Sequence, residues 1–340
     1  INPILLPTGY RLEFGGDSQE RGELVEDLTA PLGTIIAAYL TRSGEDVTLI
    51  ARGARAKLLI ENGVTVTGLD DFTTQVEIAD DPVMVTSADV LILATKTYDT
   101  AAAIASVQHM GVGSVFSIQN GVMKNDLLAA AFGQDLVLGS ICMIGGAIQA
   151  DGTANYIMGN PTLIGELSGD ASARTSDIVN RFTNSGLSAA VADNILSEEW
   201  TKFVGWLGLS ALAVLTRRET WKFLADEDSA RIVARIVREA AQLPRHLDIP
   251  LKAGGAFSLD LITTIGEDAA TALLVERGEA QRTTAPNFRQ SMLQDVDKGK
   301  QFEVEETFGH VVQQAKAFGL AVPTIETCYG ILAGLNRMQG

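Results

Sequence analysis

The chain has 340 residues, 46% of them hydrophobic, which indicates two domains with a sizeable core. Its formal net charge of −16 argues against binding of nucleic acid or of an anionic membrane surface. No apolar run is long enough to cross a membrane, no signal peptide is visible, and the two cysteines form no disulfide or zinc pattern, so we expect a cytoplasmic protein.

The first predicted elements have the pattern of a dinucleotide-binding unit. Residues 34–40 have the spacing of a buried helix face, and Gly44 follows as a helix stop. Residues 46–50 are short, apolar and β-branched, as in a buried parallel strand. A helix followed by such a strand is typical of the second half of a Rossmann crossover.

The first half of that crossover departs from the pattern. A G-x-G-x-x-G turn lets the backbone approach a pyrophosphate, but only the third glycine, Gly33, is present; Leu28 and Ala30 occupy the first two positions. No segment before Glu26 alternates convincingly, so we expect the first strand to be lost unless residues 3–7 (PILLP) form it. Weak nucleotide binding follows from this interpretation.

Strands and helices then alternate along the chain. We predict a strand over residues 87–96 that ends in Lys96, a helix over 100–108, and a strand over 113–121 that contains Asn120. Further strands are expected within 135–148, 154–167 and 187–193, with a helix over 171–184. This alternation predicts an α/β fold with a Rossmann-like, doubly wound parallel sheet, which binds ligands at the carboxyl ends of its strands. Lys96 and Asn120 therefore fall on the ligand side.

The chain becomes helical after Asn194. Helices are predicted over residues 197–215, 228–243, 283–299 and 303–319, and after Pro323. We therefore expect a Rossmann-like domain over 1–195 and an all-helical C-terminal domain over 196–340. The helical half could also support a homodimer. The three histidines are scattered and no acidic cluster suggests a metal site.

Five short motifs together resemble the ketopantoate reductase (2-dehydropantoate 2-reductase) family. They are ATK ending at Lys96, QNG with Asn120, EEWTKF with Lys202, SMLQD beginning at Ser291, and Glu303 twelve residues after that serine. The resemblance runs from about Gly33 to the end of the chain. It implies a Rossmann domain, a helical domain, and NADPH-dependent reduction of the 2-oxo acid 2-dehydropantoate to pantoate, a step of pantothenate biosynthesis.

The resemblance also implies the catalytic roles. Lys202 would be the general acid, and Glu303 would orient Lys202 and hydrogen-bond the substrate hydroxyl. From the residues alone, the favoured interpretation of Lys202 is a lysine whose stem lies along an amphipathic helix. Glu303 could belong to a solvated acidic face together with Glu305 and Glu306.

Binding roles follow in the same way. Ser291 would help bind the substrate, although it could instead cap a helix. Asn120 would contact the cofactor or the reacting carbonyl, Lys96 would lie near both ligands, and Gly33 would belong to the cofactor site. For Asn120 and Lys96 the alternative is an ordinary turn or rim residue.

Arg52 bears on the choice of cofactor. It stands about 20 residues after Gly33, where an NAD-specific fold carries an acidic residue for the ribose hydroxyls. An arginine there can bind a 2′-phosphate, so we expect NADP(H), with Arg55 assisting. The alternative is a surface arginine.

Two substrate positions depart from the family pattern. The family usually has asparagines four and eight residues after the lysine, but this chain has Trp206 and Ser210. Three interpretations therefore stay open: a 2-dehydropantoate reductase, a paralogue for another 2-oxo acid, or a non-catalytic relative with an impaired nucleotide site. The residues before about 30 are interpreted as differing from the family's natural N-terminus.

Overall fold

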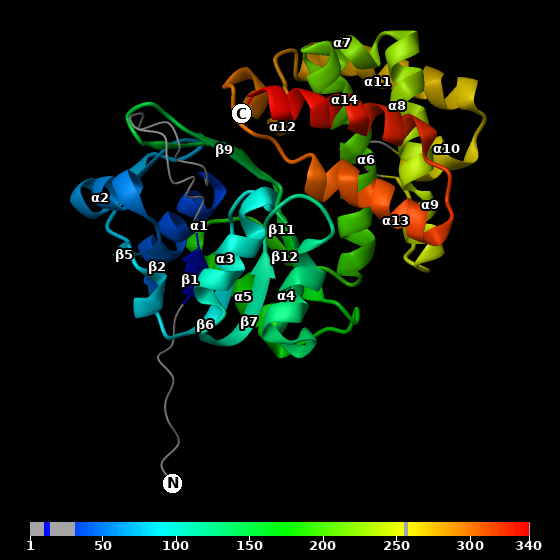
Figure 1. Cartoon of the computed structure of the whole chain (residues 1–340). Coiled ribbons are helices and arrows are strands. Elements are labelled where there is room, and N and C mark those ends of the chain that lie inside the picture. The colour runs from blue at the N-terminus through cyan, green and yellow to red at the C-terminus, as the bar shows by residue number, and fades with distance from the viewer. Residues whose placement is uncertain (1–9, 14–30, 255–257, 340) are drawn as a thin grey trace. The chain divides into compact units, whose positions relative to one another are not determined.

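The computed structural model describes residues 10–13, 31–254 and 258–339. The chain divides into two compact units, residues 1–195 and 196–340 (Figure 1). The division lies beside Asn194, after which the sequence becomes helical. Each unit is described by itself.

The first unit is built from short strands and helices. Its described strands are β1 (Tyr10–Glu13), β2 (Val47–Ile50), β3 (Val64–Gly68), β4 (Phe72–Thr74), β5 (Glu77–Ala79), β6 (Ser87–Leu93), β7 (Gly111–Ser117), β8 (Leu138–Ile141), β9 (Ile144–Ile148), β10 (Ala154–Gly159), β11 (Thr162–Glu166) and β12 (Ala189–Val191). Its described α-helices are α1 (Pro31–Arg42), α2 (Gly53–Asn62), α3 (Thr100–Val107), α4 (Lys124–Phe132) and α5 (Ala173–Ser185).

Five of these strands form a parallel sheet in the order β5-β2-β1-β6-β7. In chain order this is the Rossmann arrangement, with β1 in the centre and a switch point between β1 and β6. The predicted loss of the first strand is therefore wrong. Leu12 in β1 pairs with Leu49 on one side and with Ile92 on the other. Buried parallel strands are usually continuous apolar runs, whereas residues 10–13 (YRLE) include Arg11 and Glu13, so the sequence pattern gave no sign of this strand.

The remaining strands form two smaller sheets. The orders are β4-β3-β10-β9 and β12-β11-β8, and both contain antiparallel pairs. The strands expected in 135–148 and 154–167 thus form, but outside the parallel sheet. β3, β4 and β5 were not among the strands expected from the sequence. The predicted α/β class with a Rossmann-like parallel sheet is confirmed.

Helix α1 is the centre of the first core. It starts at Pro31, whose missing N–H costs nothing at the first turn, and Gly44 with φ +94° follows its end. Ile35, Ile36 and Leu40 have no exposed surface, and the helix packs against β2, β3, β9, β10 and α5. Each such side chain contributes about 1.5–3 kcal/mol through burial.

The second unit is helical. Its described helices are α6 (Ile195–Thr216), which begins at the last residue of the first unit, α7 (Thr220–Leu224), α8 (Glu227–Ala240), α9 (Gln242–His246), α10 (Leu259–Thr264), α11 (Glu267–Thr284), α12 (Ser291–Asp297), a π-helical turn (Glu305–Gly309), α13 (His310–Phe318) and α14 (Pro323–Gln339). The predicted helical C-terminal half is confirmed.

One predicted helix is wrong in extent. Instead of a helix over 283–299, α11 ends at Thr284 and α12 begins only at Ser291. Pro286 disfavours helical geometry at the preceding residue and has no N–H to donate. The Trp221 indole donates to the Pro286 carbonyl at 2.8 Å, which ties the intervening segment to α7. The long helix α11 was not expected.

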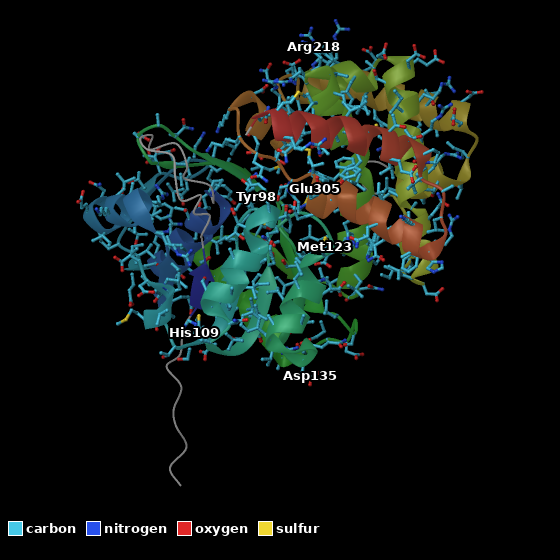
Figure 2. The ribbon with its side chains drawn as sticks, in the orientation of Figure 1. Tyr98, His109, Met123, Asp135, Arg218 and Glu305 are labelled. Atoms are coloured by element: carbon cyan, nitrogen blue, oxygen red, sulfur yellow. The ribbon has the colours of Figure 1, made fainter. Side chains whose placement is uncertain are left out.

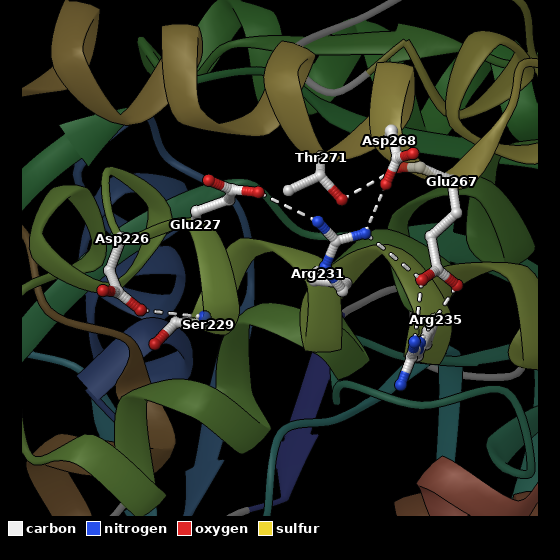
Figure 3. A network of polar contacts seen from close by, with 8 residues as sticks. All are labelled: Asp226, Glu227, Ser229, Arg231, Arg235, Glu267, Asp268 and Thr271. Carbon is white, nitrogen blue, oxygen red and sulfur yellow. Dashed lines mark hydrogen bonds and ion pairs between the residues drawn. The ribbon is translucent and has the colours of Figure 1, made fainter.

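An ion-pair network joins α8 to α11 (Figure 3). Arg235 donates to both carboxylate oxygens of Glu267, at 2.7 and 3.0 Å. Arg231 donates to Asp268 at 2.6 Å and to Glu227 at 2.9 Å. The paired geometry fixes how the two helices align, although ion pairs exposed in this way contribute little to stability.

Candidate active site

Three predicted cofactor residues follow the carboxyl ends of parallel strands. Arg52 comes just after β2, Lys96 after β6 and Asn120 after β7. Because the three strands run in the same direction, their carboxyl ends meet at one edge of the sheet. In doubly wound sheets that edge is where nucleotides bind.

Figure 2 lets the reader find this edge within the first unit. Tyr98 and Met123 follow β6 and β7, and they lie on the opposite side of the unit from His109 and Asp135, which precede β7 and β8. The loops that carry Lys96 and Asn120 therefore share one side.

Arg52 stands at the N-terminus of α2. It is the N-cap residue, with φ −120° and ψ 165°, and its side chain does not cap the helix. Within the part of the chain that the structure describes, its guanidinium makes no hydrogen bond or ion pair. The first turn of α2 contains no acidic residue. The free backbone N–H groups and the positive end of the helix dipole add to the charge of Arg52, a combination that suits a phosphate.

Arg55, one turn into α2, points elsewhere. Its Nη1 donates to the carbonyl oxygen of Gly152 at 3.0 Å, in the turn between β9 and β10. Burial lowers the pKa of Arg55 to about 10, and its Nη2 is buried without a hydrogen-bond partner. This guanidinium thus anchors the β9–β10 turn through one nitrogen and keeps a second donor unused.

The glycine motif is only partly within the described residues. Gly33 is buried in the first turn of α1, and the third glycine of such a motif allows close packing of helix and strand. The other two motif positions, Leu28 and Ala30, lie outside the described residues, as do residues 3–7.

The Gln119 side chain joins the loops after β6 and β7. Its Nε2 donates to Thr95 Oγ1 at 2.9 Å, to the Lys96 carbonyl at 3.0 Å and to Thr100 Oγ1 at 2.8 Å. Its Oε1 accepts from Ser117 Oγ at 2.9 Å. The buried amide thereby couples the backbone of Lys96 to the residue next to Asn120. Sequence reasoning missed Gln119, although it is the first letter of the QNG motif.

In the second unit, α6 carries three predicted residues. Lys202, Trp206 and Ser210 are four residues apart and so lie along one side of the helix. Lys202 and Trp206 are half-buried, and the Trp206 ring stacks on Phe203 with 6.4 Å between centroids. Ser210 is fully buried, and its hydroxyl has no hydrogen-bond partner in the described structure.

The first turns of α6 are anchored close to Lys202. Thr201 Oγ1 accepts from the backbone N–H of Lys252 at 2.8 Å, and Ser197 Oγ donates to the Pro250 carbonyl at 2.6 Å. Glu198 forms an ion pair with Lys252. These contacts attach the part of α6 next to the half-buried Lys202 to the segment that contains Pro250 and Lys252.

Glu303 is buried, with 3% of its surface exposed, whereas Glu305 is exposed. The solvated acidic face considered for Glu303 is therefore wrong. The π-helical turn starts two residues later, and Thr307 Oγ1 donates back to the Glu303 carbonyl. On the preceding side, Asn336 Oδ1 accepts from the Phe302 N–H at 3.0 Å. Such π-turns are often found at functional sites.

Ser291 is the first residue of α12 and is exposed. The N-cap position belongs to Gln290, so the alternative of Ser291 as a helix cap is wrong. Gln290 is buried and its Nε2 donates to Thr220 Oγ1 at 3.2 Å. The Ser291 hydroxyl is therefore at the surface of the second unit.

The described residues contain neither a cluster that could hold a metal ion nor a helix that could cross a membrane. No cluster of three or more His, Cys, Asp or Glu side chains among them could hold a metal ion. Among the described helices, none combines the length and apolar character needed to cross a membrane.

The sheet order and the loops at its carboxyl edge define a Rossmann-type dinucleotide-binding fold joined to a helical unit. The model of the family "Ketopantoate reductase PanE/ApbA" matches residues 31–169, and that of "Ketopantoate reductase PanE/ApbA C terminal" matches residues 194–336. The chain belongs to the ketopantoate reductase family.

Individual relatives are distant. A 2-dehydropantoate 2-reductase of Pyrococcus abyssi is 27% identical over 315 residues, covering 91% of this chain and 96% of that protein. A PanE/ApbA family ketopantoate reductase from Ralstonia eutropha has a similar structure, with a TM-score of 0.79, 20% identity, and coverage of 97% of this chain and 99% of that one. D-mandelate dehydrogenase in a complex with NADH and anilino(oxo)acetate gives a TM-score of 0.78 at 16% identity, with the same coverage.

Proposed function

We propose that this protein is an NADPH-dependent reductase of a 2-oxo acid, with 2-dehydropantoate as the first substrate to test and pantoate as its product. Its membership of a family of oxidoreductases supports the reaction class. The observation that carries the proposal is the coupled edge of the parallel sheet, where Gln119 joins the Lys96 and Asn120 loops beside the switch point.

Arg52 supports NADPH as the reductant. Its guanidinium has no partner within the described residues, and the first turn of α2 lacks the acidic side chain that would favour ribose hydroxyls. Gly33, Lys96 and Asn120 would hold the rest of the nucleotide. When bound, NADPH supplies the hydride.

The proton and the orientation of the substrate would come from the second unit. The Lys202 ammonium would stabilise the developing alkoxide and then donate its proton to it, yielding the 2-hydroxy acid. Glu303 would orient that ammonium and accept a hydrogen bond from the substrate hydroxyl. The burial of Glu303 supports this role, because a carboxylate removed from water interacts strongly with a nearby cation. Ser291 would bind the substrate from its exposed position.

A second candidate is a paralogue that reduces a different 2-oxo acid. Trp206 offers one N–H donor and a large apolar ring where an asparagine is expected, and Ser210 is fully buried. These features favour a bulky apolar substituent over a hydroxyl-bearing one. The similarity to D-mandelate dehydrogenase supports such a substrate.

One experiment separates these candidates from a non-catalytic relative. We would titrate the chain with NADPH and NADH, and follow NADPH oxidation with 2-dehydropantoate and with an aromatic 2-oxo acid. The higher kcat/KM identifies the substrate class. A folded chain that binds neither nucleotide would refute the reductase proposal. Replacing residues 1–32 by a strand and a complete glycine turn then tests whether the atypical N-terminus is the cause.

The location and the oligomeric state of the protein remain predictions. We expect the protein in the cytoplasm, which cell fractionation would test. We also expect a homodimer, which light scattering would detect as a solution mass of twice 36.1 kDa.

A further inference from the structure

Lys124, the first residue of α4, is a buried cation that the proposed reaction does not use. Only 4% of its surface is exposed. Its Nζ donates to the carbonyl oxygen of Gln119 at 3.1 Å and to that of Ser140 at 2.5 Å. Burying an ammonium costs free energy unless such hydrogen bonds compensate for the lost water. If Lys124 served only to fill space, an apolar side chain would stabilise the fold more.

The two carbonyls belong to different segments of the first unit. Ser140 lies in β8 of the three-stranded sheet, whereas Gln119 follows β7 of the parallel sheet. A second bond joins the same segments, because Ser140 Oγ donates to the Ser117 carbonyl at 2.7 Å. Lys124 thus connects the β7 loop to an element outside the Rossmann sheet.

The bond from Lys124 to the Gln119 carbonyl orients the peptide unit that leads into Asn120, the residue proposed to bind the cofactor. The Gln119 carbonyl belongs to the peptide unit whose nitrogen is that of Asn120, and this unit is planar, so fixing the oxygen orients the Asn120 backbone. Gly121 follows with φ +85°, a turn that takes the chain out of the strand. The last backbone bond of the strand ladder is that from the Ile118 N–H to the Leu93 carbonyl, at 2.9 Å, and the next carbonyl but one, that of Gln119, accepts from the Lys124 side chain instead.

We propose that Lys124 is a positioning residue that holds Asn120 in its cofactor-binding geometry. The Gln119 side chain extends the support to the Lys96 backbone and to Thr95 and Thr100. One connected set of hydrogen bonds therefore joins strand β8 to the loops after β6 and β7. Within this set, the Lys124 ammonium bonds both Ser140 of β8 and Gln119 of the β7 loop. The role rests on the proposed nucleotide site, and it adds a residue that does not itself touch the ligand.

The test compares Lys124→Met with Lys316→Met. Both remove one lysine charge, but Lys316 is exposed on α13 of the other unit. Hydrogen exchange measured by mass spectrometry reports on the loop, and fluorescence titration reports the NADPH dissociation constant. For Lys124→Met we expect at least tenfold faster exchange in residues 118–122, no comparable change in α5, and at least a tenfold higher dissociation constant. Lys316→Met should change neither by more than twofold.

The outcomes separate this proposal from the proposed function. Unchanged exchange in residues 118–122, or exchange that rises throughout the first unit, overturns the positioning role whether or not the protein binds nucleotide. Faster local exchange with unchanged NADPH affinity overturns the link to the cofactor. A wild-type chain that binds no nucleotide refutes the proposed function and, with it, the role of Lys124 at that site. If Lys124→Met does not fold, the same two measurements are made on Lys124→Gln, whose side-chain amide can still donate a hydrogen bond.

Discussion

The replacement Arg52→Ala tests the cofactor choice most directly. The Arg52 side chain has no internal partner to lose, because it neither caps α2 nor forms an ion pair within the described residues. The substitution should therefore leave stability nearly unchanged, and its effect should be confined to ligands with a phosphate at the ribose 2′ position.

The expected magnitude follows from the chemistry of that contact. A hydrogen bond to a charged group contributes about 1.5–3 kcal/mol, and about 1.4 kcal/mol corresponds to a tenfold change in affinity. Arg52 is only half-buried, so water screens part of the interaction and the lower end applies. We expect the NADPH dissociation constant to rise about tenfold and that of NADH to change by less than twofold.

The assay is a fluorescence titration of both nucleotides at low salt, with Arg218→Ala as the control. Arg218 is an exposed arginine of the second unit (Figure 2), so its removal matches the change in charge. The NADPH contact should also weaken as ionic strength rises, because a half-buried charge pair is screened. Equal losses for NADPH and NADH, or no loss for either, would refute the assignment of Arg52 to the 2′-phosphate.

Three further predictions concern catalysis and stability. Lys202→Met should lower kcat by about 10²–10⁴-fold without weakening NADPH binding, as single-turnover kinetics and titration would reveal; retained turnover would exclude Lys202 as the general acid. Ser210→Ala removes a buried hydroxyl that has no partner, so urea unfolding should give equal or greater stability, whereas a raised KM would instead place this residue in the substrate site. The Arg174 guanidinium donates to both Glu166 oxygens and holds the pKa of that carboxyl below its usual value. The pair therefore stabilises the protein at pH values above the pKa of Glu166 in the unfolded chain, and this contribution is lost as the pH falls through its lower pKa in the folded chain. Glu166→Gln should therefore cost up to about 1 kcal/mol at pH 7 and almost nothing in strongly acidic solution, and a cost independent of pH would contradict the ion-pair explanation.

Much of the candidate site could be predicted because its residues stand at element ends. Lys96 and Asn120 follow apolar runs, and parallel pairing of β6 and β7 brings such run ends to one edge. Arg52 is recognisable for the same reason, since it follows the apolar strand β2 by two residues and is the N-cap residue of α2.

The residues that support the site gave no comparable signal. Gln119 and Lys124 are polar residues near an Asn-Gly turn, a context typical of solvated loops. Their burial depends on Thr95 and Ser140, which lie 24 and 16 positions away in the chain. Glu303 likewise stands near other acidic residues in the sequence. Only the folded second unit shows that Glu303 is buried, with 3% of its surface exposed, whereas Glu305 is exposed.

By itself, the sequence determined the alternation of elements, the change to helices after Asn194 and the chemistry at the strand ends. These features are local, because periodicity and turn residues act over a few positions along the chain. Tertiary structure alone decided that residues 10–13 form the central strand, that β3 pairs with β10, and that Lys124 is buried with its ammonium bonded to the loop after β7 and to β8. Each of these depends on partners distant in sequence, whose backbone and side-chain donors meet only when the chain folds.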